Sequence, residues 1–114
     1  MPVLTSQLEI CRRYGVEPML PNPDQRVGIA MSTIGVQPIN GCRVRANSVL
    51  SGWFVFCGSE PSDEHDFYDS LCYEHIDRHL AAVVPYLCLP EGWNFQISEN
   101  GYEDIWFEPR LLGD

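Results

Sequence analysis

The stretch GWFVFCGSEPSDEHDFYD, residues 52–69, joins an apolar run directly to an acidic one. Successive side chains of a strand point to opposite faces, so Trp53, Val55 and Cys57 would share one face and the two phenylalanines between them the other. Both faces are apolar, which predicts a strand covered on both sides. Five carboxylates follow within ten residues, with no lysine or arginine among them, so they either keep a small protein soluble or bind something positive. They are Glu60, Asp63, Glu64, Asp66 and Asp69.

The length and composition predict one domain, residues 1–114. Hydrophobic residues make up 45% of the chain and aromatic residues 11%, enough to bury one core. No signal-peptide pattern opens the chain, and no apolar run approaches the roughly 20 residues of a membrane span, so we expect a cytoplasmic protein. The cysteines are odd in number and scattered, which predicts reduced thiols. They are Cys11, Cys42, Cys57, Cys72 and Cys88.

The charge is unevenly divided along the chain. Residues 1–59 hold five arginines and three acids, a net charge of +2, whereas residues 60–114 hold two arginines and thirteen acids, a net charge of −11. Such a field repels nucleic acid and anionic lipid and speeds association with a basic partner. The chain contains no lysine, which excludes Schiff-base chemistry.

Local patterns in the first half predict a helix and strands. A helix should begin at Thr5 or Ser6, with Glu9 completing a capping box, and end at Gly15. The alternation in RVGIAMST predicts a strand, and the pair Asn40-Gly41 predicts a hairpin turn between QPI and CRVR.

The second half predicts a helix and a hairpin. Apolar residues recur at helical spacing from about residue 70 to residue 84, and Pro85 should end or kink that helix. WNFQIS and YEDIWFE alternate around Asn100-Gly101, which predicts a two-residue hairpin with one face on the core. The fold class is therefore α+β: an antiparallel sheet of four to five strands, an N-terminal helix, and a helical insert before a C-terminal hairpin.

Cys72, His75 and His79 have the spacing C-x2-H-x3-H and would share part of a helical face. Zinc requires four ligands, or three and a water, and the sequence shows no second spaced group that completes the set. We predict no metal, no cofactor and no catalytic residues. The alternative is a small metal-dependent or thiol enzyme that uses these three residues; a further alternative is a housekeeping oligomer.

An exposed tryptophan and a second set of acidic residues are candidates for a partner-binding surface. Trp53 and Trp93 are expected in the core, whereas Trp106 alternates with Ile105 and Phe107, so either Trp106 or that pair is exposed. If the acidic loop and the hairpin lie at one edge of the sheet, their fields add. The hairpin acids are Glu99, Glu103, Asp104 and Glu108.

Four ordered blocks of the chain resemble the thirty-third immunity-protein family of bacterial polymorphic toxin systems, over roughly residues 1 to 112. The acidic loop departs from the family pattern at His65, and Cys57 interrupts the aromatic strand. The blocks are RVGIAMSTIGVQPINGCR, GWFVFCGSEPSDEHDFYDSL, YEHIDRH running into VVPYLCLPEGWNFQI, and GYEDIWFEPRLL.

The resemblance implies a non-enzymatic α+β protein that binds and neutralises a cognate toxin, commonly encoded beside it. Because many nuclease toxins are basic, an acidic protein can block them by charge complementarity. We expect neither nucleic acid nor membrane as a partner. The loop carboxylates Glu60, Asp63, Glu64, Asp66 and Asp69 are the first choice for the partner-binding surface. Glu103 and Asp104 are the second choice, with Tyr68 and Trp106 as aromatic anchors.

Overall fold

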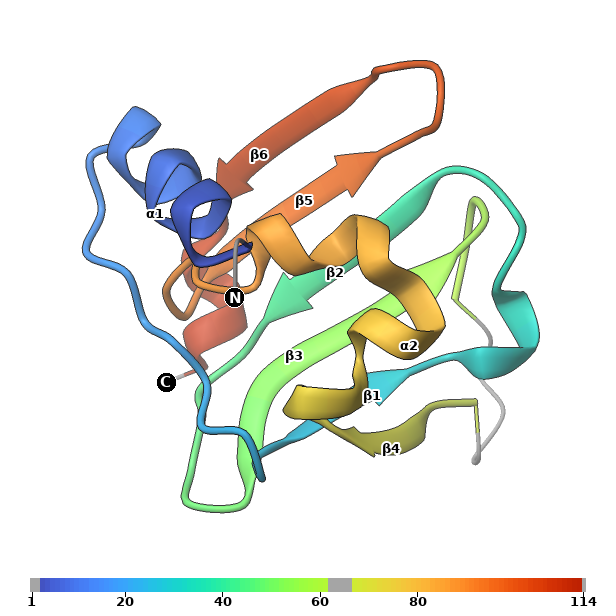
Figure 1. Ribbon diagram of the computed structural model, residues 1–114, viewed down its shortest axis with the longest axis horizontal. Helices are drawn as coiled ribbons and strands as arrows, with labels where there is room; N and C mark the ends of the chain where they lie inside the picture. The colour runs from blue at the N-terminus through green and yellow to red at the C-terminus, as the bar shows by residue number, and fades with distance from the viewer. Residues whose placement is uncertain (1–2, 62–66, 114) are drawn as a thin grey trace.

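The fold is a six-stranded mixed sheet with both α-helices and the 3-10 segment that follows the second helix on one face, as the computed structural model of residues 3–61 and 67–113 shows (Figure 1). The strand order is β4-β1-β3-β2-β5-β6, in which β1 and β3 are parallel and all other neighbours antiparallel. The strands are β1 (Arg26–Ile29), β2 (Ile39–Arg43), β3 (Leu50–Cys57), β4 (Asp69–Cys72), β5 (Trp93–Ile97) and β6 (Glu103–Phe107). The α-helices are α1 (Val3–Arg13) and α2 (Asp77–Leu80), and the 3-10 segments are η1 (Met31–Thr33), η2 (Tyr73–His75), η3 (Ala81–Tyr86) and η4 (Pro109–Leu112).

The α+β class is confirmed, but the predicted strand number and the all-antiparallel sheet are wrong. The sheet gains a strand because DSLC, expected to be helical, forms β4 and pairs with β1. Leu71 lies opposite Val27, while Ser70 and Cys72 alternate to the other face. Four residues are too short a run for helical and strand periodicity to be told apart. Only Asp77–Leu80 of the predicted helix is α-helical, and the chain continues as η3 through Pro85.

The N-terminal helix ends as predicted and begins earlier than predicted. Gly15 has φ +66°, and the amides of Gly15 and Val16 donate to the carbonyls of Arg12 and Cys11. This is a Schellman motif, which requires a left-handed residue and therefore favours glycine. Helix α1 already includes Val3, so Ser6 is not its N-cap, and Glu9 pairs with Arg12 instead.

Asn40-Gly41 does not form a turn. Both residues lie inside β2, which is paired on one side with β3 and on the other with β5. A Cβ at Gly41 would lie 2.2 Å from Cε2 of Phe95. Glycine is needed at position 41 because the Phe95 ring packs directly on the backbone. In the sequence alone, a glycine of this kind cannot be told from a glycine in a turn.

The C-terminal hairpin is confirmed, with a longer turn than predicted. Ile97 pairs with Glu103, and the Ser98 amide donates to the Tyr102 carbonyl, so three residues, 99–101, connect the strands. Gly101 has φ +94°, the left-handed conformation that three-residue hairpin loops need.

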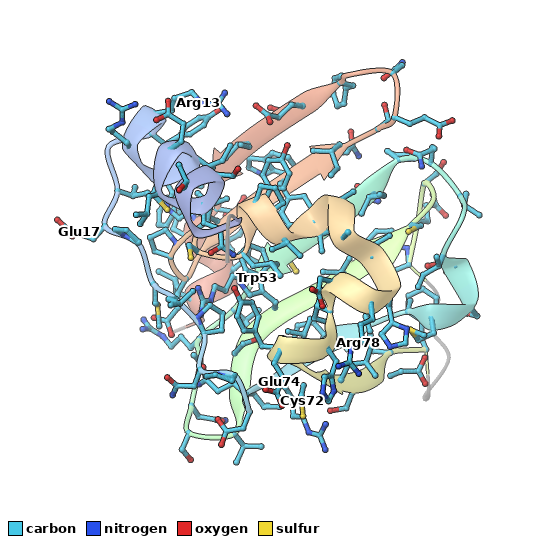
Figure 2. All side chains as sticks on the ribbon, viewed as in Figure 1. Arg13, Glu17, Trp53, Cys72, Glu74 and Arg78 are labelled. Carbon is cyan, nitrogen blue, oxygen red and sulfur yellow. The ribbon has the colours of Figure 1, made fainter. Side chains whose placement is uncertain are left out.

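The core lies between the sheet and the helical layer. Trp53 and Phe95 are fully buried there, as the central position of Trp53 in Figure 2 illustrates. Arg43 is also buried, at 1% exposure, and its guanidinium donates to the carbonyls of Met19, Ser51 and Leu89 at 2.6 to 2.9 Å. No helix in the described part of the chain is long and apolar enough to cross a membrane.

Candidate functional site: the acidic end of the sheet

Five exposed carboxylates gather where several strands end together. Ile39 at the start of β2 pairs with Cys57 at the end of β3 and with Ile97 at the end of β5. Ile97 in turn pairs with Glu103 at the start of β6, so these four strand ends lie side by side. The start of β4 lies at the same end, because Asp69 pairs with Ile29 at the end of β1. We call this set the acidic end: Glu60, Asp69, Glu99, Glu103 and Asp104.

Asp69 and the hairpin lie at one end of the sheet but not at one edge, which was the condition for their fields to add. Strands β4 and β6 form opposite edges of the sheet (Figure 1). Five strand spacings of about 4.8 Å separate them, roughly 24 Å. Three residues of the predicted surface, Asp63, Glu64 and Asp66, lie outside the described residues.

Two acidic-end carboxylates have structural partners. Glu103 accepts a hydrogen bond from the Tyr86 hydroxyl at 2.6 Å and pairs with Arg13 at 3.1 Å. Asp69 accepts from the Met31 amide at 3.3 Å. Burial, and then the hydrogen bond to Glu103, raise the pKa of Tyr86 well above its ordinary value. In residues 3–61 and 67–113, Arg13 is the only arginine that pairs with a carboxylate of this end.

The other end of the sheet carries both arginines that lie on strands, and two more that follow strands. Arg26 begins β1 and Arg43 ends β2, where it pairs in register with Trp53. Arg45 and Arg110 follow β2 and β6 at the same end. Asp24, Glu91 and Glu108 lie at this end as well and offset these arginines, so the excess negative charge of the described residues lies at the acidic end.

The sheet face opposite the helices is only partly covered, and we call it the open face. Phe54 and Phe56 lie on it, and Tyr68 and Phe67 pack over them with ring centroids 5.2 and 6.4 Å apart respectively. Tyr68 is therefore half-buried against the sheet, and burial raises the pKa of its hydroxyl. Its role as an aromatic anchor for a partner stays a prediction.

Strand β6 exposes aromatic side chains on both of its faces. Ile105 is 7% exposed, whereas Trp106 is 40% and Phe107 is 47% exposed, so the alternative in which Trp106 is exposed is confirmed, and Phe107 is exposed as well. Trp106 and Asp104 lie on the open face, opposite in phase to Ile105. Beside Trp106, the buried amide nitrogen of Asn94 has no hydrogen-bond partner in the described structure. Sequence alternation identified the strand but could not show that Phe107, which is in phase with the buried Ile105, is exposed.

The three residues of the enzyme alternative do not form a metal site. Cys72 ends β4 and receives a hydrogen bond from the Arg26 guanidinium at 3.2 Å, while His75 lies in η2 and His79 in α2. Among residues 3–61 and 67–113, no group of three His, Cys, Asp or Glu side chains is arranged to hold a metal ion. In Figure 2, Cys72 at the end of β4 and Arg78 in α2 lie on the opposite side of the view from Arg13 in α1.

The comparison with protein families places this α+β fold with its acidic end among the immunity proteins. The chain belongs to the Imm33-like domain family, whose model matches residues 6–108. The resemblance found in the sequence is thereby confirmed. Membership suggests toxin neutralisation in general and a role in binding, not catalysis. No curated protein and no solved structure is significantly similar to the chain.

Proposed function

We propose that the protein neutralises a cognate, basic bacterial toxin in the cytoplasm by binding it through the acidic end. The family match over residues 6–108 carries the proposal, because an immunity protein acts by occupying its toxin. The net charge of −9 and the gathering of carboxylates at one end of the sheet support a basic partner. Complementary charge raises the association rate, which suits a protein that must reach a toxin before the toxin acts.

The surface itself is suited to binding because most of its carboxylates are free of cations. Glu60, Glu99 and Asp104 are exposed and form no ion pair in the part of the chain that the structure describes. A basic partner would therefore pair with them without first displacing an arginine. Glu103 is different, since Arg13 and Tyr86 already hold it in place.

The test is binding to the toxin domain encoded beside the gene, produced as an inactive variant. One quadruple variant neutralises the acidic end: Glu60→Gln, Asp69→Asn, Glu99→Gln and Asp104→Asn. A matched control removes four exposed carboxylates elsewhere: Glu17→Gln, Asp24→Asn, Glu74→Gln and Asp77→Asn.

We expect the first variant to bind at least about tenfold more weakly than the control at low salt, with a smaller difference at higher salt. Both variants change the net charge by the same amount, so the comparison separates local contact from the overall field. Equal weakening in both would move the interface away from the acidic end. Absence of binding by the unmodified protein would contradict the proposed function.

A further inference from the structure

Strand β6 ends the sheet with its outer backbone groups unpaired. In the described structure β6 pairs with β5 alone. The Ser98 amide donates to the Tyr102 carbonyl, and the Glu108 amide donates to the Gly92 carbonyl. Along an antiparallel ladder every second residue pair is hydrogen-bonded. The hydrogen-bonded pairs between these two are therefore Gln96 with Asp104 and Asn94 with Trp106. Counting along the ladder, three residues direct their N–H and C=O groups outward: Glu103, Ile105 and Phe107.

Charge is the device that protects this edge from strand addition. Edge strands are commonly protected by charged side chains, proline, a bulge or extreme shortness, and β6 carries only the first of these, in Glu103 and Asp104. Strand β6 has five residues in continuous register with β5 and contains neither proline nor lysine. The opposite edge, β4, is four residues long. Strand β6 also exposes Trp106 on the open face and Phe107 on the helix face, so an added strand would meet an aromatic side chain on both sides.

The charge beside this edge decides what kind of strand fits. Asp104 lies on the open face beside Trp106 and forms no ion pair within residues 3–61 and 67–113. A second copy of the chain would bring another strand with the same acids and another net charge of −9 to the edge. Like charges close together oppose that pairing, whereas a lysine or arginine opposite Asp104 favours it.

We propose that β6 accepts an extended basic segment of the cognate toxin as a seventh strand of the sheet. This rests on the proposed function and adds the mode of binding: main-chain hydrogen bonds to the outward groups of Glu103, Ile105 and Phe107. On the open face the toxin segment places a cationic side chain against Asp104 and an apolar one against Trp106. The two side chains belong to positions two residues apart, because every second residue of a strand shares a face.

Hydrogen exchange of the complex with the inactive toxin domain tests the proposal directly. The Ile105 and Phe107 amides should exchange readily in the free protein, because they face solvent at the edge. In the complex both should exchange at least about tenfold more slowly, since strand addition engages them. The Asp104 and Trp106 amides, already bonded to β5, serve as internal controls and should be slow in both states.

A pair of variants provides a second measurement. Glu103→Ala and Glu103→Pro both lose the contacts of the carboxylate with Tyr86 and Arg13, but only the proline also loses the outward N–H. Proline is tolerated at the first position of a strand, and thermal unfolding will show that both variants fold. Glu103→Pro should bind the toxin domain about tenfold more weakly than Glu103→Ala, the effect expected for one unmade interfacial hydrogen bond.

The outcomes separate the two proposals. A complex in which the Ile105 and Phe107 amides stay unprotected, or equal affinities for the two variants, would overturn the seventh-strand model and leave the proposed function intact. Protection of these amides in the chain alone, together with a concentration-dependent dimer, would assign the edge to a second copy and overturn the model. Absence of any complex would overturn both.

Discussion

Replacing the buried Arg43 should destabilise the protein strongly, although the residue is remote from the acidic end. The guanidinium donates to the carbonyls of Met19, Ser51 and Leu89, which join the segment before β1, the start of β3 and the segment before β5. Its carbon Cζ also lies 5.6 Å from the centroid of the Trp53 ring. Burial lowers the pKa of Arg43, an effect opposed by nearby Glu91, and no carboxylate contacts it in the described structure.

The expected magnitude follows from the bonds that Arg43→Met would remove. Arg43 donates four hydrogen bonds, of which the one to the Leu87 carbonyl is long at 3.5 Å. The three shorter bonds, at roughly 1 kcal/mol each, put the loss of unfolding free energy at about 3 kcal/mol. The lost cation–π contact with Trp53 adds to the destabilisation. The variant no longer buries a charge, which reduces the destabilisation by a similar amount. Domains of this size have unfolding free energies of about 5–15 kcal/mol, so the variant should still fold. Its midpoint temperature should fall by about 10–15 °C.

Urea unfolding followed by tryptophan fluorescence measures this change, since Trp53 lies beside Arg43. The matched control is Arg45→Met, because Arg45 is exposed and makes a single bond from Nε to the Leu112 carbonyl. The control should lie within about 0.5 kcal/mol of the unmodified protein. A loss below about 1 kcal/mol for Arg43→Met would show that the carbonyls find other partners and that the reasoning is wrong.

Three further predictions concern packing, pH and binding. Gly41→Ala places a methyl group against the Phe95 ring and should cost about 1–3 kcal/mol of unfolding free energy in the same urea assay, and an unchanged midpoint would contradict the close packing. Burial raises the pKa of Cys88 from 9.0 to about 11, and the pKa of Tyr86 is raised as well. Since the unfolded thiol ionises first, unfolding free energy should fall as the pH rises from about 9 to 11, and Cys88→Ala should show a shallower fall in unfolding measured across that range. Trp106→Ala should leave the protein folded in the urea assay, because Trp106 is 40% exposed and lies outside the core cluster, yet weaken toxin binding about tenfold or more in a titration.

Several features follow from the sequence because they depend on neighbouring residues. The end of α1 at Gly15, the two-sided strand β3 and the C-terminal hairpin are set by local backbone preference and by alternation of apolar side chains. The acidic character and the family resemblance are also properties of the residues in order. These patterns require no knowledge of which strand lies beside which.

The tertiary structure decided everything that depends on long-range pairing. Gly41 became part of β2 because Phe95, 54 residues later, packs on it, and Asp69–Cys72 became a strand because β1 offered it an edge. Strand order placed the two acidic segments at one end but at opposite edges of the sheet. Strand order also left the outward N–H and C=O groups of β6 without a partner strand. Every residue except proline carries the same backbone donor and acceptor, so only the position of a strand in the sheet determines which of these groups remain unpaired.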